Sequence, residues 1–177
     1  QGTALPDGTS VEGTLRGGIA QLSAFSELAG RPISGAAGFS ASASANPSEG
    51  SFDLSLGGTL RGLTTGIAQL DTLVPGTNNV ELDANRTAEG VLTIERFEIT
   101  GPQITGSASG STGAQQNSLQ FQARLADLGR LVSDLPGAAT IQGSAQQSNG
   151  GNWQVSLDGS GPGGVRRTTT RLLDGEF

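Results

Sequence analysis

The chain has no cysteine, histidine, lysine, methionine or tyrosine among its 177 residues, and all ten of its basic residues are arginine. Without His and Cys, the usual zinc sites, thiol nucleophiles and Ser–His catalytic arrangements are excluded. Without Lys, Schiff-base chemistry and the phosphate-binding lysine of a P-loop are excluded as well. Carboxylates are therefore the remaining candidates for acid–base chemistry.

Long apolar runs and positive charge are also lacking. No run approaches the roughly 18 apolar residues of a membrane-spanning helix, and no basic-then-apolar targeting signal is visible. The net charge of −6 disfavours a nucleic-acid partner, because such partners need clustered basic residues. The one basic cluster, Arg166, Arg167 and Arg171 beside Asp174 and Glu176, predicts a solvated strand face. A chain without methionine is expected to be an internal segment or a processed product.

Large core side chains are scarce, since aromatic residues make up 4% of the chain while glycine numbers 29. What the chain has instead is alternation. In ISGAAGFSASASA (33–45), odd positions are mostly small and apolar, and even positions are mostly serine. This period of two predicts a strand with one dry face and one wet face.

One unit recurs three times, as IAQLSAFSELAGRPISGAAGF, IAQLDTLVPGTNNVELDA and LADLGRLVSDLPGAATIQGSA. Each copy opens with apolar residues at helical spacing, which predicts a helix of one or two turns. These residues are Leu22, Phe25 and Leu28, then Leu70 and Leu73, then Leu128, Leu131 and Leu135. Each segment ends at a glycine (Gly30, Gly76, Gly137), and alternating strands are predicted to start at Ile33, Val80 and Ile141.

A turn-rich cluster follows each of these strands, and a second alternating strand follows the turn, which predicts β-hairpins. The turns are NPSEG (46–50), NRTAEG (85–90) and SNGGN (148–152). Further alternating segments at 97–110 and 119–125 lengthen the second period. The chain is thus predicted to be a single segment, 1–177, of a β-repeat array with approximate repeats 14–58, 62–110 and 121–165.

Hairpins with one apolar face can close into a filled barrel or sandwich, or can curl into an open trough that something else fills. Small residues at the inward positions would leave costly voids in a closed core. They are Ala37, Ala41, Ala43, Ala84, Ala108, Ala123 and Ala145. We therefore predict a mainly β fold in which repeated antiparallel hairpins curl into an elongated, taco-like open β-trough. Short amphipathic helices, which we expect to cap the sheet, lie at one end of each repeat.

The phrases ADLGRLVSDLPGAATIQGSA, GNWQVSLDGSGPGG and EGVLTIERFEITGPQITGSASG resemble the repeats of the TamB family, in the AsmA-like group of bacterial envelope proteins. The resemblance covers about residues 14–165 and includes no catalytic signature. It implies a full-length protein that is anchored in the inner membrane outside this fragment, crosses the periplasm, and partners a TamA-like outer-membrane β-barrel protein. It also implies a hydrophobic trough that carries lipid acyl chains between the two membranes and supports outer-membrane protein assembly.

We therefore expect phospholipid acyl chains to contact the inward apolar residues, with no enzymatic activity, metal or cofactor. The predicted lining is Ile33, Ala37, Phe39, Ala41, Ala43, Phe52, Leu54, Leu56, Val80, Leu82, Leu92, Ile94, Phe97, Ile99, Ile104, Leu119, Phe121, Leu125, Ile141, Trp153, Val155 and Leu157. Trp153 shares the parity of Val155, so a lining role is favoured over a dedicated stacking site.

Two candidate binding motifs, a glycine-rich segment and a set of carboxylate and amide side chains, are better explained as turns than as ligand sites. DGSGPGG (158–164) lacks the G-K-[ST] ending of a phosphate loop, so it predicts a flexible turn. Oxygens for Ca²⁺ exist in Asp83, Asn85 and Glu89, and in Asp158 and Asp174, but no fixed spacing joins them.

A carboxylate pair and a glycosylation sequon also fail to indicate a functional site. Glu95 and Glu98 lie three positions apart in a strand, so opposite faces are predicted and a carboxylate dyad is not. The sequence Asn85-Arg86-Thr87 fits the N-glycosylation sequon, which carries meaning only if the bacterial resemblance is wrong.

Two alternative hypotheses belong to other classes. A structural β-repeat of a cell-surface adhesin or autotransporter passenger would have a closed core and a binding outer face. A carboxylate-dependent enzyme on a β-solenoid is disfavoured by the lack of paired carboxylates. Whether the apolar face of residues 33–45 is open or covered distinguishes the trough from the closed repeat.

Overall fold

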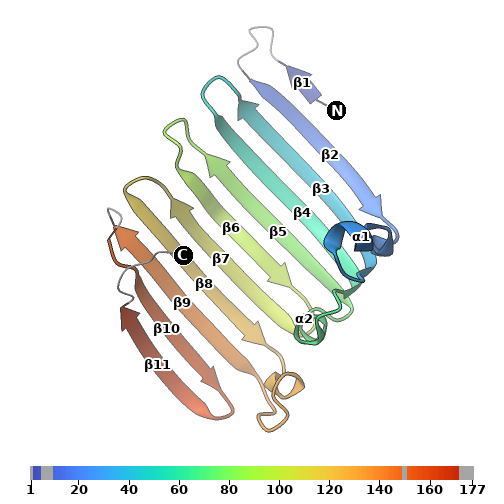
Figure 1. Ribbon diagram of the computed structural model, residues 1–177, viewed down its shortest axis with the longest axis vertical. Helices are drawn as coiled ribbons and strands as arrows, with labels where there is room; N and C mark the ends of the chain where they lie inside the picture. Colours follow the sequence, from blue (N-terminus) through green and yellow to red (C-terminus); the bar gives the residue numbers. More distant parts are fainter. Residues whose placement is uncertain (1, 5–9, 149–150, 172–177) are drawn as a thin grey trace.

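The computed structural model describes residues 2–4, 10–148 and 151–171, with backbone alone for 2–4 and 165–171. The fold is one antiparallel sheet of eleven strands in sequence order, so each strand pairs with its chain neighbours (Figure 1). The strands are β1 (Gly2–Ala4), β2 (Val11–Ile19), β3 (Ser34–Asn46), β4 (Ser51–Thr64), β5 (Thr77–Arg86), β6 (Leu92–Thr100), β7 (Ile104–Thr112), β8 (Gln116–Leu125), β9 (Ala139–Ser148), β10 (Gln154–Gly161) and β11 (Gly164–Arg171). The prediction of a mainly β, open antiparallel fold is confirmed.

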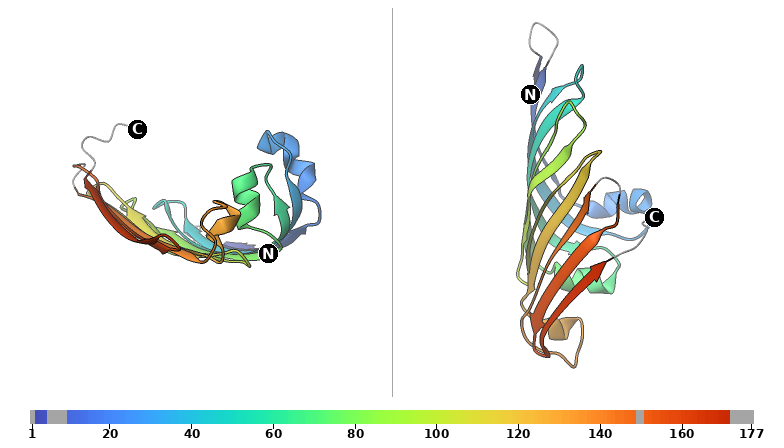
Figure 2. Two further views of the ribbon diagram at one scale, coloured as in Figure 1. Left: turned by 90° about the horizontal axis from the view of Figure 1, so that it is seen from below. Right: turned by 90° about the vertical axis from the view of Figure 1, so that its left-hand side faces the viewer.

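Short helices lie in the connections that follow β2, β4 and β8. They are η1 (Leu22–Phe25), α1 (Ser26–Ala29), α2 (Ala68–Leu73) and η2 (Leu128–Arg130). These connections share one end of the sheet and rise over its concave side (Figure 2). Among the described residues, no helix combines the length and the apolar character that crossing a membrane requires.

Of the three glycines predicted to end the helical segments, only Gly30 caps a helix, because α2 ends at Leu73 and η2 at Arg130, with Val74 and Leu131 as their C-caps. Gly30 follows α1 with a φ of 66°, in the left-handed region where glycine is favoured. Gly76 and Gly137 have φ angles of 68° and 124° and precede the next strands. Those strands begin at Ser34, Thr77 and Ala139, within three residues of the predicted starts.

The first helical segment differs from the prediction in how it packs. Leu22, Phe25 and Leu28 were expected to share one face, yet Leu28 is 87% exposed and Phe25 43% exposed. The reason is that 22–25 forms a 3₁₀ turn and 26–29 an α turn, so no single helical period runs through the segment. The helix therefore marks one end of the sheet without covering it.

A polar side chain stabilises each helical connection. The Ser26 hydroxyl donates to the Ile33 carbonyl and accepts from the Ile33 N–H. Asp71 accepts from the Thr65 N–H and hydroxyl, and the N–H bond is the main cause that lowers the pKa of this carboxyl. Backbone N–H groups of Gly137 and Gly129 bond Asp127 in the same way and lower its pKa.

Acid is expected to destabilise the connection that Asp127 holds. Because the folded-state pKa of Asp127 is lowered, the stability it contributes is present above the unfolded value of about 3.9 and is lost as pH falls below it. The Asp127→Asn variant is therefore expected to show a smaller drop in urea midpoint between pH 6 and pH 3 than the unmodified chain. Asp134→Asn, which changes an exposed carboxylate in the same connection, is the control; equal drops in all three proteins would refute the role given to Asp127.

Candidate functional site

The strand register gathers the apolar side chains on one face of the sheet. Between β2 and β10, three complete rows run across the strands, and every position in them is apolar or glycine. The first row is Gly13, Ala43, Leu54, Ala84, Ile94, Gly110, Leu119, Ala145 and Val155. The second is Leu15, Ala41, Leu56, Leu82, Phe97, Ala108, Phe121, Gly143 and Leu157; the third is Gly17, Phe39, Gly58, Val80, Ile99, Gly106, Ala123, Ile141 and Gly159.

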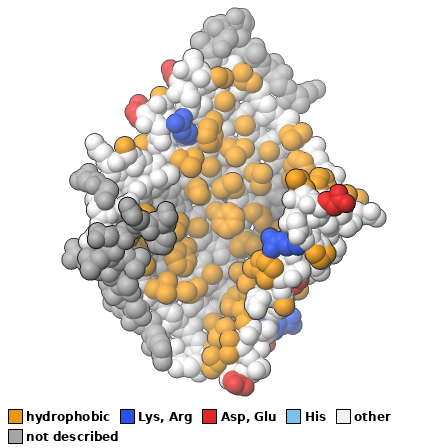
Figure 3. Space-filling view, viewed as in Figure 1, with side chains coloured by type: hydrophobic (Ala, Val, Ile, Leu, Met, Phe, Trp, Pro, Cys, Tyr) orange, Lys and Arg blue, Asp and Glu red, His pale blue; other side chains and the backbone are white. Residues whose placement is uncertain are grey.

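A fourth, partial row continues this face toward the helical end. It contains Ile19, Ala37 and Leu60, and farther along the sheet Ile104, Leu125 and Ala139. Figure 3 shows the apolar side chains spread over the middle of the sheet on the face that carries the helices. Figure 2 shows that this face is the hollow side of the curved sheet. We call these four rows the concave face.

A β-bulge keeps the apolar residues of β6 on the concave face. The pairing with β5 shifts between Asp83 and Ala84: Asp83 pairs with Arg96 and Ala84 with Ile94. Glu95 is therefore an extra residue of β6 that has no partner in the register. Glu95 bonds Asn85 on the polar face, and Arg96 bonds Asp83 there. Ile94 and Phe97, on either side of the bulge, therefore both point to the concave face.

The same bulge shows that the parity argument for Glu95 and Glu98 was wrong. The two carboxylates share the polar face, because the bulge adds one residue between them. Each has surroundings of its own: Glu95 Oε1 accepts from Asn85 Nδ2 at 2.8 Å, and Glu98 stands opposite Glu81. Their contacts give no sign of shared acid–base chemistry.

In the described part of the chain, the helical connections rise over one end of the concave side (Figure 2), and the apolar side chains of the concave face stay at least partly exposed. No apolar side chain of that part is buried, and Leu15 (61%), Leu119 (41%) and Ile141 (39%) are among the exposed ones. With strands about 4.8 Å apart and residues about 3.3 Å apart, the three complete rows over nine strands span about 38 by 13 Å, or about 500 Å², and the partial fourth row extends this area. The largest apolar patch of an ordinary soluble monomer is about 300–600 Å².

Two aromatic rings lie over glycines and keep this face shallow. A Cβ on Gly17 would lie 2.7 Å from Cζ of Phe39, its register partner in β3. A Cβ on Gly143 would lie 2.7 Å from Cζ of Phe121, its partner in β8. Each ring thus occupies the space that a side chain on the adjacent strand would fill.

The structure places the predicted lining residues on the apolar side of the strands, except Ile33 and Trp153, which precede β3 and β10. Both of these are partly exposed, and the backbone of Ile33 bonds Ser26. Phe52 and Leu92 share the apolar side but lie one row beyond the concave face, toward the turn end. Whether these residues contact lipid stays a prediction.

The sequence reading missed β2, which carries Leu15 and Ile19. In VEGTLRGGI every second residue from Val11 is apolar or glycine, so the alternation is present but two of its five apolar-side positions are glycine. Counting glycine as compatible with an apolar face would have detected this strand. Asp174 and Glu176 lie outside the described residues, and the predicted solvated face of Arg166, Arg167 and Arg171 falls on the backbone-only part of β11.

The opposite face is polar and carries the ion pairs. Arg96 pairs with Glu81 Oε2 at 2.7 Å and with Asp83 Oδ2 at 2.8 Å. Hydrogen bonds from Ser55 and then from Arg96 lower the pKa of Asp83. Since the Arg96 side chain is about half exposed, water screens these pairs and they contribute little to stability.

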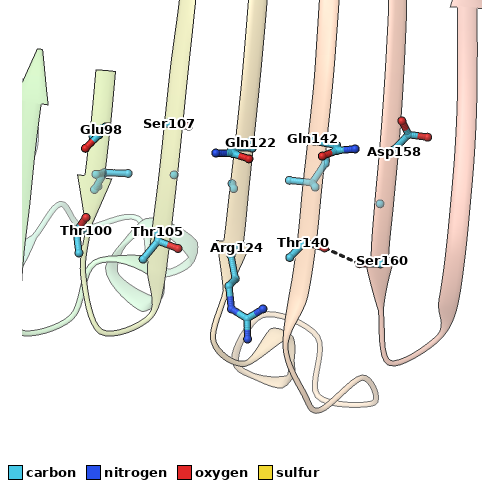
Figure 4. A pocket seen from close by; sticks show the side chains of 15 residues that line it. Glu98, Thr100, Thr105, Ser107, Gln122, Arg124, Thr140, Gln142, Asp158 and Ser160 are labelled. Carbon is cyan, nitrogen blue, oxygen red and sulfur yellow. Dashed lines mark hydrogen bonds between the residues drawn. The ribbon is translucent and has the colours of Figure 1, made fainter. Parts of the chain in front are cut away.

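A shallow hollow of about 630 Å³ crosses the polar face over β6 to β10 (Figure 4). One row of its lining runs from Glu98 through Ser107, Gln122 and Gln142 to Asp158. The two carboxylates are four strands apart, or about 19 Å, which is too far for joint acid–base catalysis on one bond. Within the described residues, no three or more metal-ligating side chains cluster. The described lining of the hollow therefore consists mainly of hydrogen-bonding groups.

Comparison with known proteins gives this chain no relative: no protein family matches it, and no curated protein or solved structure shows significant similarity to it.

Proposed function

We propose that this chain is a segment of a TamB-like bridge in the bacterial periplasm, and that its concave face is a trough for lipid acyl chains. The observation that carries the proposal is the apolar concave face of an open sheet, whose three complete rows span about 500 Å² and whose side chains stay at least partly exposed among the described residues. In the proposal, the complete protein is anchored in the inner membrane by a segment outside this chain. A TamA-like outer-membrane protein is its partner, and the complete protein supports outer-membrane protein assembly.

The lining suits a guest that must move. Each acyl methylene that leaves water for an apolar surface contributes about 0.8 kcal/mol, so even a partly covered chain is held. The concave face alternates Leu, Ile and Phe with Ala and Gly, and it makes contacts without fixed direction. Such a surface can retain hydrocarbon at many equivalent positions without one deep pocket. The proposal includes no catalytic step.

The adhesin or autotransporter alternative expects a closed core. The open sheet and the exposure of the inward side chains in the described residues support the trough instead. The face of residues 33–45, on which the two hypotheses differ, belongs to the concave face through Phe39, Ala41 and Ala43, on the second of its nine strands.

Quenching of the single tryptophan tests the proposal. If acyl chains enter the trough at β10, phosphatidylcholine with brominated acyl chains is expected to quench Trp153 fluorescence, while the unbrominated lipid does not. Binding is followed in parallel by co-elution of the lipid with the protein. Co-elution without quenching would remove Trp153 from the lining, and no co-elution of either lipid would refute the proposed function.

A further inference from the structure

One charged side chain stands on the apolar side of the sheet. Arg86 is the last residue of β5, where Val80, Leu82 and Ala84 alternate before it on the concave face. Its register partners, Phe52 and Leu92, are both apolar. Among the described positions of β2 to β10 that share this side, no other residue carries a charge.

The turns on both sides leave room for the guanidinium. Arg86 Nη1 donates to the carbonyl of Gly50, in the turn between β3 and β4. A Cβ on Gly50 would lie 3.0 Å from Nη1, and a Cβ on Gly90, in the turn between β5 and β6, would lie 3.4 Å from Nη2. The two glycines thus form a cradle that positions the charge at the turn end of the concave face. A guanidinium has five N–H donors, and this bond uses one of them.

Further along the sheet, the same end of the apolar side becomes polar. In the row of Arg86, the Thr112 hydroxyl donates to Asn117 Oδ1 at 2.6 Å, and Asn117 Nδ2 donates to Gln147 Oε1 at 2.8 Å. The opposite end carries the helical connections (Figure 2). The apolar side of the sheet therefore carries polar groups at its turn end, namely Arg86 on β5 and the Thr112–Asn117–Gln147 series on β7 to β9, beyond the apolar rows of the concave face.

The length of the strand from Arg86 to the helical end is sufficient for the acyl chain of one bilayer leaflet. Arg86 and Val80 are six residues apart, which is about 20 Å in a strand. The chains of one leaflet span about 15 Å, half of the 30 Å hydrocarbon core. An acyl chain that lies along β5 would thus run past Ala84 and Leu82 while its headgroup reaches the guanidinium.

We propose that Arg86 binds the phosphate of a phospholipid headgroup, and that the acyl chain of this lipid lies along the strands toward the helical end. The proposal rests on the trough function above and adds the orientation of the guest and the charge of its headgroup. A planar guanidinium suits a phosphate because two parallel N–H groups can bond two of its oxygens. Glu49 and Glu89 lie in the adjacent turns, but the described residues show no ion pair between either carboxylate and Arg86.

The test compares two ligands with the same fluorescent acyl chains, phosphatidylglycerol and the uncharged diacylglycerol. Arg86→Gln is expected to weaken phosphatidylglycerol binding about tenfold, the size of one charged hydrogen bond, and to leave diacylglycerol binding unchanged. Arg86→Lys is expected to recover part of the loss, since the charge returns without the planar fork. Arg16→Gln, which removes a charge from the polar face, is the matched control and is expected to change neither affinity.

The outcomes separate the two proposals. Equal weakening of both ligands by Arg86→Gln would mean that Arg86 acts only by holding the Gly50 turn, and would overturn the headgroup assignment. Unchanged phosphatidylglycerol binding would overturn it as well. If the unmodified chain binds neither ligand, the trough function itself fails.

Discussion

Leu119→Asp is expected to lower the affinity of this chain for phospholipid by about 30-fold or more. A carboxylate facing hydrocarbon costs about 2 kcal/mol or more on membrane-insertion scales, and each 1.4 kcal/mol is a tenfold change in affinity. Leu119 lies in the first row of the concave face and is 41% exposed. The fold is therefore expected to tolerate the substitution, which separates binding from stability.

The neighbouring residue provides the control. Gln120 is exposed on the polar face of the same strand, so Gln120→Asp places the same charge one residue away on the other side of the sheet. It is expected to leave lipid binding intact. Far-ultraviolet circular dichroism and urea unfolding confirm that both variants fold. If both variants lost lipid equally, or neither did, the concave face would not be the lipid site.

Gly110→Ala is expected to have the largest effect on stability, about 2–3 kcal/mol of destabilisation or more. A Cβ at this position would lie 2.3 Å from the Ser118 carbonyl oxygen and 3.1 Å from Leu119 Cα. Both neighbours are backbone atoms of β8, so relief requires β7 and β8 to move apart along a paired ladder. Thermal unfolding would register this loss as a drop of about 5–10 °C for a domain of this size.

Gly38→Ala is the contrasting substitution. Nothing lies within 4 Å of a Cβ there, and Gly38 is not among the residues with positive φ. Because alanine restricts the unfolded chain more than glycine does, this variant is expected to be stabilised by about 0.4–1 kcal/mol. Two variants of equal stability would show that β7 is not packed against β8 in this register.

The strands could be predicted because their alternation is strong. The serine–alanine alternation at 33–45 and the apolar residues of 52–56 and 92–94 needed no tertiary information. The positions of the helical segments were also predictable from the spacing of their apolar residues, but only the first segment ends at its predicted glycine. The bulge at Glu95 was not, because the sequence does not say which of two adjacent polar residues is the extra one.

Two features of the site depend on contacts between strands that are distant in sequence. The cradle of Arg86 requires the β3–β4 turn to lie beside the end of β5, a consequence of register across 36 residues. The exposure of Leu15 and Leu119 depends on what packs over them, and no local pattern encodes the absence of a cover. The low aromatic content indicated a poorly filled core, and the open sheet accords with that indication.

Native mass spectrometry of this chain, produced in a bacterial periplasm and extracted for lipids, tests the central claim most directly. The account predicts phospholipid that co-purifies with the folded chain and that the Leu119→Asp variant lacks. A folded, lipid-free monomer that also ignores added phospholipid would contradict the account and favour the closed structural repeat.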